Sequence, residues 1–187
     1  MASTASATEE LSCARQELDN MHQNGDEKQK QRHWRNFLNH LDKAWVKLVI
    51  GCGDMEGKFQ RIKSQVKEKQ KKDPLLIYLA QARDADNHSV QNLAGFQFSH
   101  ELPIDQASIT MSVIREGVEI SKTEAMPMNL YTFQAVPFTN RGKQYSVPQY
   151  HIGLRIVDHL NPFVLGTIGI DYYTNQIART RELLQID

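Results

Sequence analysis

One apolar stripe places the strongest constraint on the fold of this chain. Residues at steps of three and four lie on the same face of an α-helix. Between residues 27 and 50 the apolar positions follow these steps at Trp34, Phe37, Leu38, Leu41, Trp45 and Leu48. The spacing therefore predicts a helix over about 27–50 that buries one face, and Gly51-Cys52-Gly53 ends it. Other apolar faces must cover this stripe, so a helical bundle is expected.

Capping signals predict four further helices. Each begins at a polar residue whose side chain can accept a hydrogen bond from the first turn, and in two of them proline follows directly. The predicted ranges are about 8–23, 54–72, 74–93 and 162–184. Gly166 and Gly169 weaken the last of these by up to about 1 kcal/mol each relative to alanine. In a buried helix they can instead permit a neighbour to approach closely.

Residues 96–160 follow a different pattern. The β-rich runs Ile109–Ile114 and Val118–Ile120 flank a turn and predict a small hairpin, and Tyr131–Val136 predicts one more strand. Residues 151–160 suit a short helix, and prolines place most of the remainder in loops or edge strands. The predicted fold is mainly α: a bundle of about five helices with a small β-rich insertion before the last helix.

The composition fits one intracellular domain. We expect a single helical domain over 8–187, after a small polar segment at 1–7 that we expect to be disordered. With only Cys13 and Cys52, the chain suits a reducing compartment such as the cytoplasm. We expect neither a secretory signal nor a membrane helix, because no basic start precedes an apolar run and no apolar run approaches roughly 18 residues.

Positive charge is concentrated in the second and third predicted helices. The chain has 22 Lys or Arg and 22 Asp or Glu, so its formal net charge is zero. Residues 28–72 hold 13 of the basic and 4 of the acidic residues, and the rest of the chain balances this excess. Two interpretations stay open: a solvated surface that complements acidic regions, or a face that contacts nucleic-acid phosphates. The candidate RNA-binding residues are Lys63, Lys67, Lys69, Lys71 and Lys72.

A short polar segment in the fourth predicted helix carries the candidate chemistry. It reads Arg83-Asp84-Ala85-Asp86-Asn87-His88. At 3.6 residues per turn, Arg83 and His88 differ by about 140° of rotation and about 7.5 Å of rise, so both can border one cleft. Asp84 lies one turn before His88 and can orient its imidazole, whereas Arg83 presents a planar fork that suits a phosphate.

This segment resembles the motif of the HEPN superfamily. Those proteins are helical bundles marked by an arginine, a polar residue directly after it, and a histidine five to seven positions on. Here the three positions are Arg83, Asp84 and His88, at the shortest of these spacings. The resemblance covers the predicted bundle from about Lys28 to Leu93, with the last helix completing it. The β-rich insertion is not a general feature of that superfamily.

The resemblance implies a metal-independent ribonuclease of a defence or toxin type, without a cofactor. Many HEPN proteins act as homodimers in which two such helices face each other across a composite site. His88 would then act as general base or acid at the ribose 2′-hydroxyl, and Arg83 would stabilise charge on the scissile phosphate. Asp84 or Asn87 would hold the active conformation. An antitoxin or another protein is an expected partner.

Other interpretations of the same residues stay open. The segment can be a polar helix face whose charge pairs contribute about 0.2–0.5 kcal/mol each. It can also belong to a non-catalytic helical module that binds a protein partner or nucleic acid. His33 and His40 lie seven residues apart on one predicted face, but a metal site needs further ligands, so we expect boundary histidines and no metal. Phosphate-loop and serine-hydrolase motifs do not occur.

Overall fold

The computed structural model describes residues 2–88, 91–98, 111–115, 118–123 and 131–186. Within these ranges the protein is mainly α, with two-stranded β-sheets placed before the last helix, which confirms the predicted fold class. The helices are α1 (Ala5–Gln23), α2 (Glu27–Gly51), the short 3-10 helix η1 (Gly53–Met55), α3 (Glu56–Lys72), α4 (Pro74–His88) and α5 (Pro162–Leu184). No helix in the described ranges is long and apolar enough to cross a membrane.

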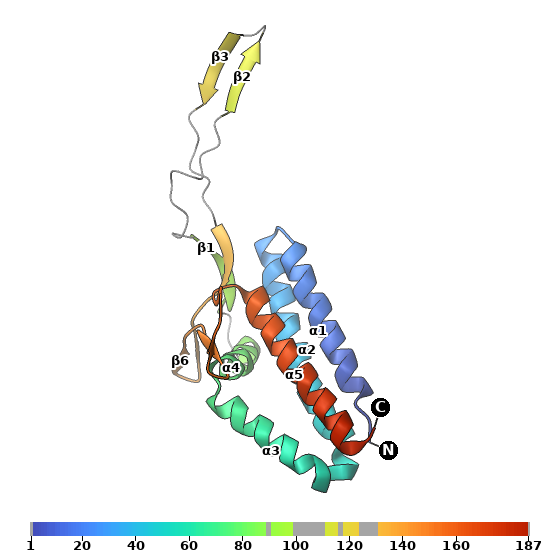
Figure 1. The fold of residues 1–187 in the computed structure, drawn as a ribbon. Coiled ribbons are helices and arrows are strands. Elements are labelled where there is room, and N and C mark those ends of the chain that lie inside the picture. Colours follow the sequence, from blue (N-terminus) through green and yellow to red (C-terminus); the bar gives the residue numbers. More distant parts are fainter. Residues whose placement is uncertain (1, 89–90, 99–110, 116–117, 124–130, 187) are drawn as a thin grey trace. The chain divides into compact units, whose positions relative to one another are not determined.

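The helices α1, α2 and α5 lie side by side (Figure 1). The side chain of Asp26 caps α2 by accepting the backbone N–H of Gln29 at 3.0 Å, where the chain reverses after α1. The predicted stripe of α2 is buried, with Trp34 and Phe37 stacked at 5.0 Å between ring centroids. None of its members exceeds 8% exposure: Trp34, Phe37, Leu38, Leu41, Trp45 and Leu48. The strongest signal in the sequence therefore defines the core.

The first turn of α1 differs from the prediction. The helix begins at Ala5 rather than near Thr8, so residues 5–7 are helical where the composition predicted disorder. Thr4 is fully buried, and its hydroxyl oxygen accepts a hydrogen bond from Nε of Arg181 in α5 at 2.7 Å. The backbone N–H of Ser3 also donates to the carbonyl of Gly51 at 2.9 Å. These contacts are remote in sequence, which is why local composition did not predict an ordered segment.

The two glycines of α5 permit close helix packing. A Cβ at Gly166 would lie 2.6 Å from Cδ1 of Leu18 in α1 and 3.1 Å from Cζ of Phe37 in α2. A Cβ at Gly169 would lie 2.8 Å from Cδ1 of Leu79 in α4. Real Cβ atoms do not approach neighbours so closely, so both positions require glycine for packing rather than for backbone freedom.

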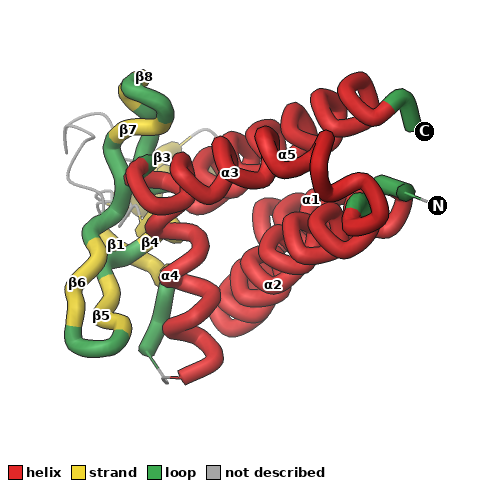
Figure 2. The backbone as a smooth tube through the Cα atoms, turned by 90° about the horizontal axis from the view of Figure 1, so that it is seen from below, coloured by secondary structure: helices red, strands yellow, loops and turns green. Residues whose placement is uncertain are grey.

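Small hairpins lie beside α4 (Figure 2). They are formed by β5 (Phe138–Asn140) with β6 (Lys143–Tyr145), and by β7 (Tyr150–His151) with β8 (Leu154–Arg155). The hydroxyl of Tyr78 in α4 donates to the carbonyl of Val136 at 2.9 Å, just before β5. Burial raises the pKa of this hydroxyl well above its ordinary value, so it stays a donor. This end of α4 is thereby fixed to the β-rich part.

The expected short helix at 151–160 is wrong. This segment instead contains β8 and the turn that joins it to β7, with turns after it. Ile152 and Gly153 form the two-residue turn with φ values of 48° and 80°, in the left-handed region that a helix cannot use. The helix α4 also ends at His88 rather than near Leu93. Leu93 lies just before a strand, and its carbonyl accepts a hydrogen bond from the N–H of Val136.

The remaining strands confirm the predicted hairpin and strand. The chain divides into two compact units, residues 1–95 with 134–187, and residues 96–133. In the second unit, β2 (Met111–Arg115) pairs antiparallel with β3 (Val118–Thr123), with a register shift between Val113 and Ile114. The strand β1 (Ala94–Phe98) pairs with β4 (Tyr131–Ala135). Ile109 and the turn at 116–117 lie outside the described residues.

We predict that Gly166→Ala destabilises the fold although alanine favours helices. The new methyl group would overpack against Leu18 and Phe37, which costs about 1–3 kcal/mol, whereas the gain in helix propensity is at most about 1 kcal/mol. Urea unfolding followed by circular dichroism measures the difference. Gly57→Ala in α3 is the matched control, because a Cβ there would meet no atom within 4 Å and should be neutral or stabilising. Equal stabilisation of both variants would contradict the packing role.

Candidate functional site

The start of α4 is fixed by one buried carboxylate. Asp73, only 5% exposed, accepts the backbone N–H of Leu76 at 3.0 Å and so caps the helix. It also accepts the N–H of Ile152 at 2.6 Å and lies 2.9 Å from Nδ1 of His151. Burial raises the pKa of Asp73, but the hydrogen bonds from His151 and the two backbone groups outweigh burial and hold this pKa below its ordinary value. The sequence predicted the cap but not His151.

Two ion pairs connect α4 to α2, and each helix supplies the arginine of one pair and the aspartate of the other. Nη2 of Arg83 lies 3.2 Å from Oδ2 of Asp42, and Nε of Arg35 lies 2.8 Å from Oδ1 of Asp86. Arg83 and Asp86 are three residues apart on α4, and Arg35 and Asp42 are seven apart on α2, so each pair of positions lies on one helix face. The helix that carries the candidate motif therefore meets α2 through charged side chains.

The guanidinium of Arg83 uses only part of its hydrogen-bonding capacity within the described part of the chain. It can donate five N–H groups, yet its contact with Asp42 is the sole polar interaction it makes with the residues that the structure describes. Its Nε atom is buried and has no hydrogen-bond partner there. The side chains of Arg83 and Asp42 are each 36% exposed, so a solvent-borne anion can reach the pair.

Asp84 points to a different element from Arg83. Its Oδ2 accepts from Nδ2 of Asn140 at 2.9 Å and lies 3.1 Å from Nε of Arg141. Arg141 and Gly142 form the two-residue turn between β5 and β6, with φ values of 49° and 77°. Arginine seldom adopts a positive φ, so the carboxylate stabilises an unusual turn. Adjacent helical residues differ by about 100°, which explains why Arg83 and Asp84 serve separate neighbours.

Asn87 and His88 lie in the last turn of α4, and α4 ends at His88. Their side chains lie outside the described residues. A shared pocket for Arg83 and His88, and a contact between Asp84 and His88, therefore stay predictions. The described part of the motif contains one partly exposed guanidinium, Arg83, and one carboxylate, Asp84, that supports a turn.

The candidate RNA-binding lysines divide between two rows of α3. Successive members of a row are three or four residues apart, which places them on one face. One row contains Lys63, Lys67 and Lys71; the other contains Lys69 and Lys72, together with Lys58, Arg61 and Gln65. All of these residues except Lys63 are exposed, and Lys72 pairs with Glu68 at 2.7 Å. The five candidates thus do not form a single surface.

Histidines on α2 bind glutamates on α1. Nδ1 of His33 lies 2.6 Å from Oε2 of Glu17, and Nδ1 of His40 lies 2.6 Å from Oε2 of Glu10. Lys47 also pairs with Glu10. Burial raises the pKa of Glu10, but the hydrogen bonds from Lys47 and His40 outweigh it and lower that pKa. Within the described ranges no three His, Cys, Asp or Glu side chains gather as metal ligands.

Comparison with known proteins finds no matching family model, no similar curated protein and no similar solved structure. The residues and geometry of this chain therefore carry the functional proposal.

We predict that Asp73→Asn lowers the free energy of unfolding by about 1–2 kcal/mol at pH 7. Asparagine keeps a helix cap, but hydrogen bonds to a charged acceptor, worth about 1.5–3 kcal/mol, become neutral ones worth about 0.5–1.5 kcal/mol. Folding lowers the pKa of Asp73, so this contribution is present above the ordinary value of 3.8 and is lost as the pH falls through the folded value. The difference between wild type and variant should therefore shrink on acidification below 3.8.

Urea unfolding at a series of pH values measures this difference. Asp26→Asn is the matched control, because Asp26 caps α2 in an exposed position and should change stability little. A difference for Asp73→Asn that is the same at pH 7 and in strong acid would show that the charge has no such role.

Proposed function

We propose that this protein cleaves RNA without a metal ion, at a composite site that two copies of α4 form in a homodimer. The single observation that carries the proposal is the state of Arg83. Its guanidinium is partly exposed, has one contact to a carboxylate, and keeps a buried Nε without a partner in the described part of the chain. The position of Arg83 on the same helix as His88, five residues earlier, gives the arginine–polar–histidine pattern of HEPN ribonucleases.

A phosphate can replace Asp42 as the partner of Arg83. Partly exposed ion pairs contribute about 0–1 kcal/mol, so little stability opposes the exchange. A phosphate offers several acceptor oxygens and accepts two parallel N–H bonds from a guanidinium, which are stronger than a single contact. Asp42 would then keep Arg83 oriented when no RNA is bound.

The proposed reaction is an internal transfer that needs no metal or cofactor. The imidazole of His88 removes the proton from a ribose 2′-hydroxyl, and the 2′ oxygen attacks the adjacent phosphorus. Arg83 stabilises the negative charge that develops on the phosphate oxygens. The bond from phosphorus to the 5′ oxygen breaks, and an imidazole returns a proton to that oxygen. The products are a 2′,3′-cyclic phosphate and a 5′-hydroxyl end.

The HEPN-type proposal includes a biological role and a location. Ribonucleases of this type serve as toxins or in defence, and their activity requires control by an antitoxin or another protein partner. Cys13 and Cys52 are both unpaired thiols, which together with an RNA substrate favours the cytoplasm.

A non-catalytic interaction module is the second candidate function. The β7–β8 hairpin and the turn after it expose several apolar side chains, which is typical of protein-binding surfaces. Leu154 is 75% and Val157 is 84% exposed, and Tyr150 and Ile152 are about half exposed. The two candidates differ in chemistry, so an assay of RNA cleavage separates them.

We predict that His88→Ala and Arg83→Ala each reduce RNA cleavage at least 100-fold in the presence of a chelator. Loss of a general base or acid typically costs about 10²–10⁴ in rate, and loss of a charge-stabilising donor costs about 10²–10³. Gel analysis of a labelled RNA measures the rate, and phosphorylation of the new 5′-hydroxyl ends by a kinase identifies the product. Arg35→Ala is the matched control, because it removes the other ion pair between α2 and α4 and should retain activity.

Equal cleavage by wild type and His88→Ala, or none by either, would remove the enzymatic proposal and leave the interaction module. The dimer makes a separate prediction. If the site is composite, the rate per protein molecule should fall on dilution as the dimer dissociates. A rate per molecule that does not change with concentration, in a protein shown to be monomeric by ultracentrifugation, would contradict the composite site.

A further inference from the structure

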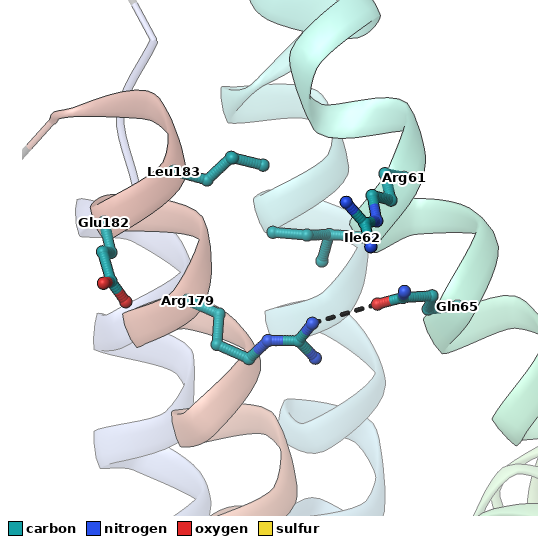
Figure 3. Close-up of a pocket in the computed structure, with 6 residues that line it drawn as sticks. All are labelled: Arg61, Ile62, Gln65, Arg179, Glu182 and Leu183. Atoms are coloured by element: carbon teal, nitrogen blue, oxygen red, sulfur yellow. Dashed lines mark hydrogen bonds between the residues drawn. The ribbon is translucent and has the colours of Figure 1, made fainter.

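A groove lies between α3 and α5, and none of the residues that line it belongs to the segment from Arg83 to His88. Its volume is about 510 Å³. Figure 3 shows that Ile62 of α3 and Leu183 of α5 extend toward each other, while Arg179 reaches from α5 toward α3. The lining residues are Arg61, Ile62, Gln65, Arg179, Glu182 and Leu183. The groove therefore combines an apolar base with two guanidinium groups.

Arg179 is held in place by neutral partners. Its Nη2 donates to Oε1 of Gln65 at 3.0 Å, and its Nη1 donates to Oε1 of Gln176 at 3.0 Å (Figure 3 shows the first bond). No carboxylate pairs with it among the residues that the structure describes. Side-chain amides orient the guanidinium without cancelling its charge, unlike the carboxylate that pairs with Arg83. The positive charge of Arg179 is thus available to an anion.

Arg61 adds a second positive charge on the α3 side of the groove. It is exposed and makes no hydrogen bond or ion pair with any described residue. Glu182 is the one carboxylate among the lining residues, and Figure 3 draws its side chain on the side of α5 that faces away from α3. The local field in the groove is therefore positive.

The positive charge continues along α3 beyond the groove. Lys58, Arg61, Gln65, Lys69 and Lys72 form one row on the helix, and it spans about 21 Å at 1.5 Å per residue. Among the side chains that the structure describes, Lys72 is the member of this row with a carboxylate partner, Glu68. A small anion would use one or two of these cations, whereas a strand with regularly spaced phosphates can contact them all.

We infer that the α3–α5 groove and the row from Lys58 to Lys72 bind the phosphodiester backbone of a single RNA strand. This inference rests on the proposed function in taking RNA as the polyanion, but it does not require cleavage. Arg179 and Arg61 contact phosphates at the groove, and Lys69 and Lys72 continue the contact toward the end of α3. The apolar side chains of Ile62 and Leu183 offer a surface to the sugar or to the edge of the nucleobase.

The test measures RNA binding in protein that carries His88→Ala, so that cleavage does not interfere. A fluorescein-labelled single-stranded RNA of about 12 nucleotides is titrated at several salt concentrations, with fluorescence anisotropy as the readout. Arg61→Ala/Arg179→Ala removes two positive charges from the groove. Lys67→Ala/Lys71→Ala removes two from the other row of α3, which the sequence also offered as RNA-binding but which the inferred surface does not include, and is the charge-matched control.

We predict that the groove variant weakens RNA binding on the order of 25-fold at 0.1 M salt. It should also reduce the slope of log affinity against log salt by about 1.4, because each phosphate contact to a single strand contributes about 0.7. The control should change affinity less than about fivefold. Thermal unfolding checks that each variant is folded, and Arg61→Ala alone repeats the test if the double variant is destabilised, since Arg61 has no described partner.

Equal losses for the groove variant and the control would overturn the inference, because binding would then follow total charge. Tighter binding of a poly-glutamate peptide of equal charge than of RNA would also overturn it, in favour of an acidic protein partner. Failure of the proposed function gives a different result: wild type does not cleave RNA, yet His88→Ala protein binds it through the groove. If wild type cleaves RNA and the groove variant binds RNA as tightly as the unmodified groove does, the inferred RNA-binding role of the groove is wrong, whereas the proposed ribonuclease activity stands.

Discussion

The buried carboxylate of Asp73 joins three parts of the chain at one point, and the position of the candidate site depends on it. Asp73 is the C-cap residue of α3, its carboxylate caps the start of α4, and the same carboxylate accepts a hydrogen bond from the turn between β7 and β8. A buried carboxylate is costly unless hydrogen bonds satisfy it, and here two backbone groups and His151 do so. Because Asp73 determines where α4 begins, it also sets the helical phase of Arg83 against α2.

The helix α2 distributes its polar side chains between two neighbours. His33, His40 and Lys47 recur at intervals of seven and face the glutamates of α1, whereas Arg35 and Asp42 face α4. A helix returns to nearly the same face every seven residues, so each row matches one partner helix along its length. The apolar stripe supplies most of the stability, and these polar rows oppose a shift of α1 or α4 by one turn, since such a shift would separate each charge from its partner.

Local signals predicted the elements whose position in the sequence is set by a local pattern. The stripe of α2 and the Asn161-Pro162 start of α5 needed no knowledge of neighbours, and both helices occur close to the predicted bounds. The prediction was wrong where remote contacts decide the structure. Thr4 is ordered by Arg181, far away in the sequence. Ile152 adopts a left-handed φ because the buried Asp73 accepts its N–H, and no pattern within residues 151–160 contains that information.

The candidate site shows the same division. Helical spacing placed Arg83 and Asp84 in the fourth helix, but it could not identify Asp42 or Arg141 as their partners. The groove was missed because its two arginines are about 120 residues apart in the sequence, and only the pairing of α3 with α5 brings them together. A charge count over 28–72 could detect the basic half of this surface, but not Arg179.

The two arginines differ in what their partners do to their charge, and this difference suggests an order of events in the proposed function. Arg83 is neutralised by Asp42, so a phosphate must displace a carboxylate before that guanidinium can stabilise a reaction. Arg179 is oriented by amides and can bind a phosphate without displacing a charged group. A strand would thus bind first where no exchange is needed. Contacts remote from the reacting phosphate could then offset the cost of separating Arg83 from Asp42, which is how binding energy far from the reacting bond contributes to catalysis.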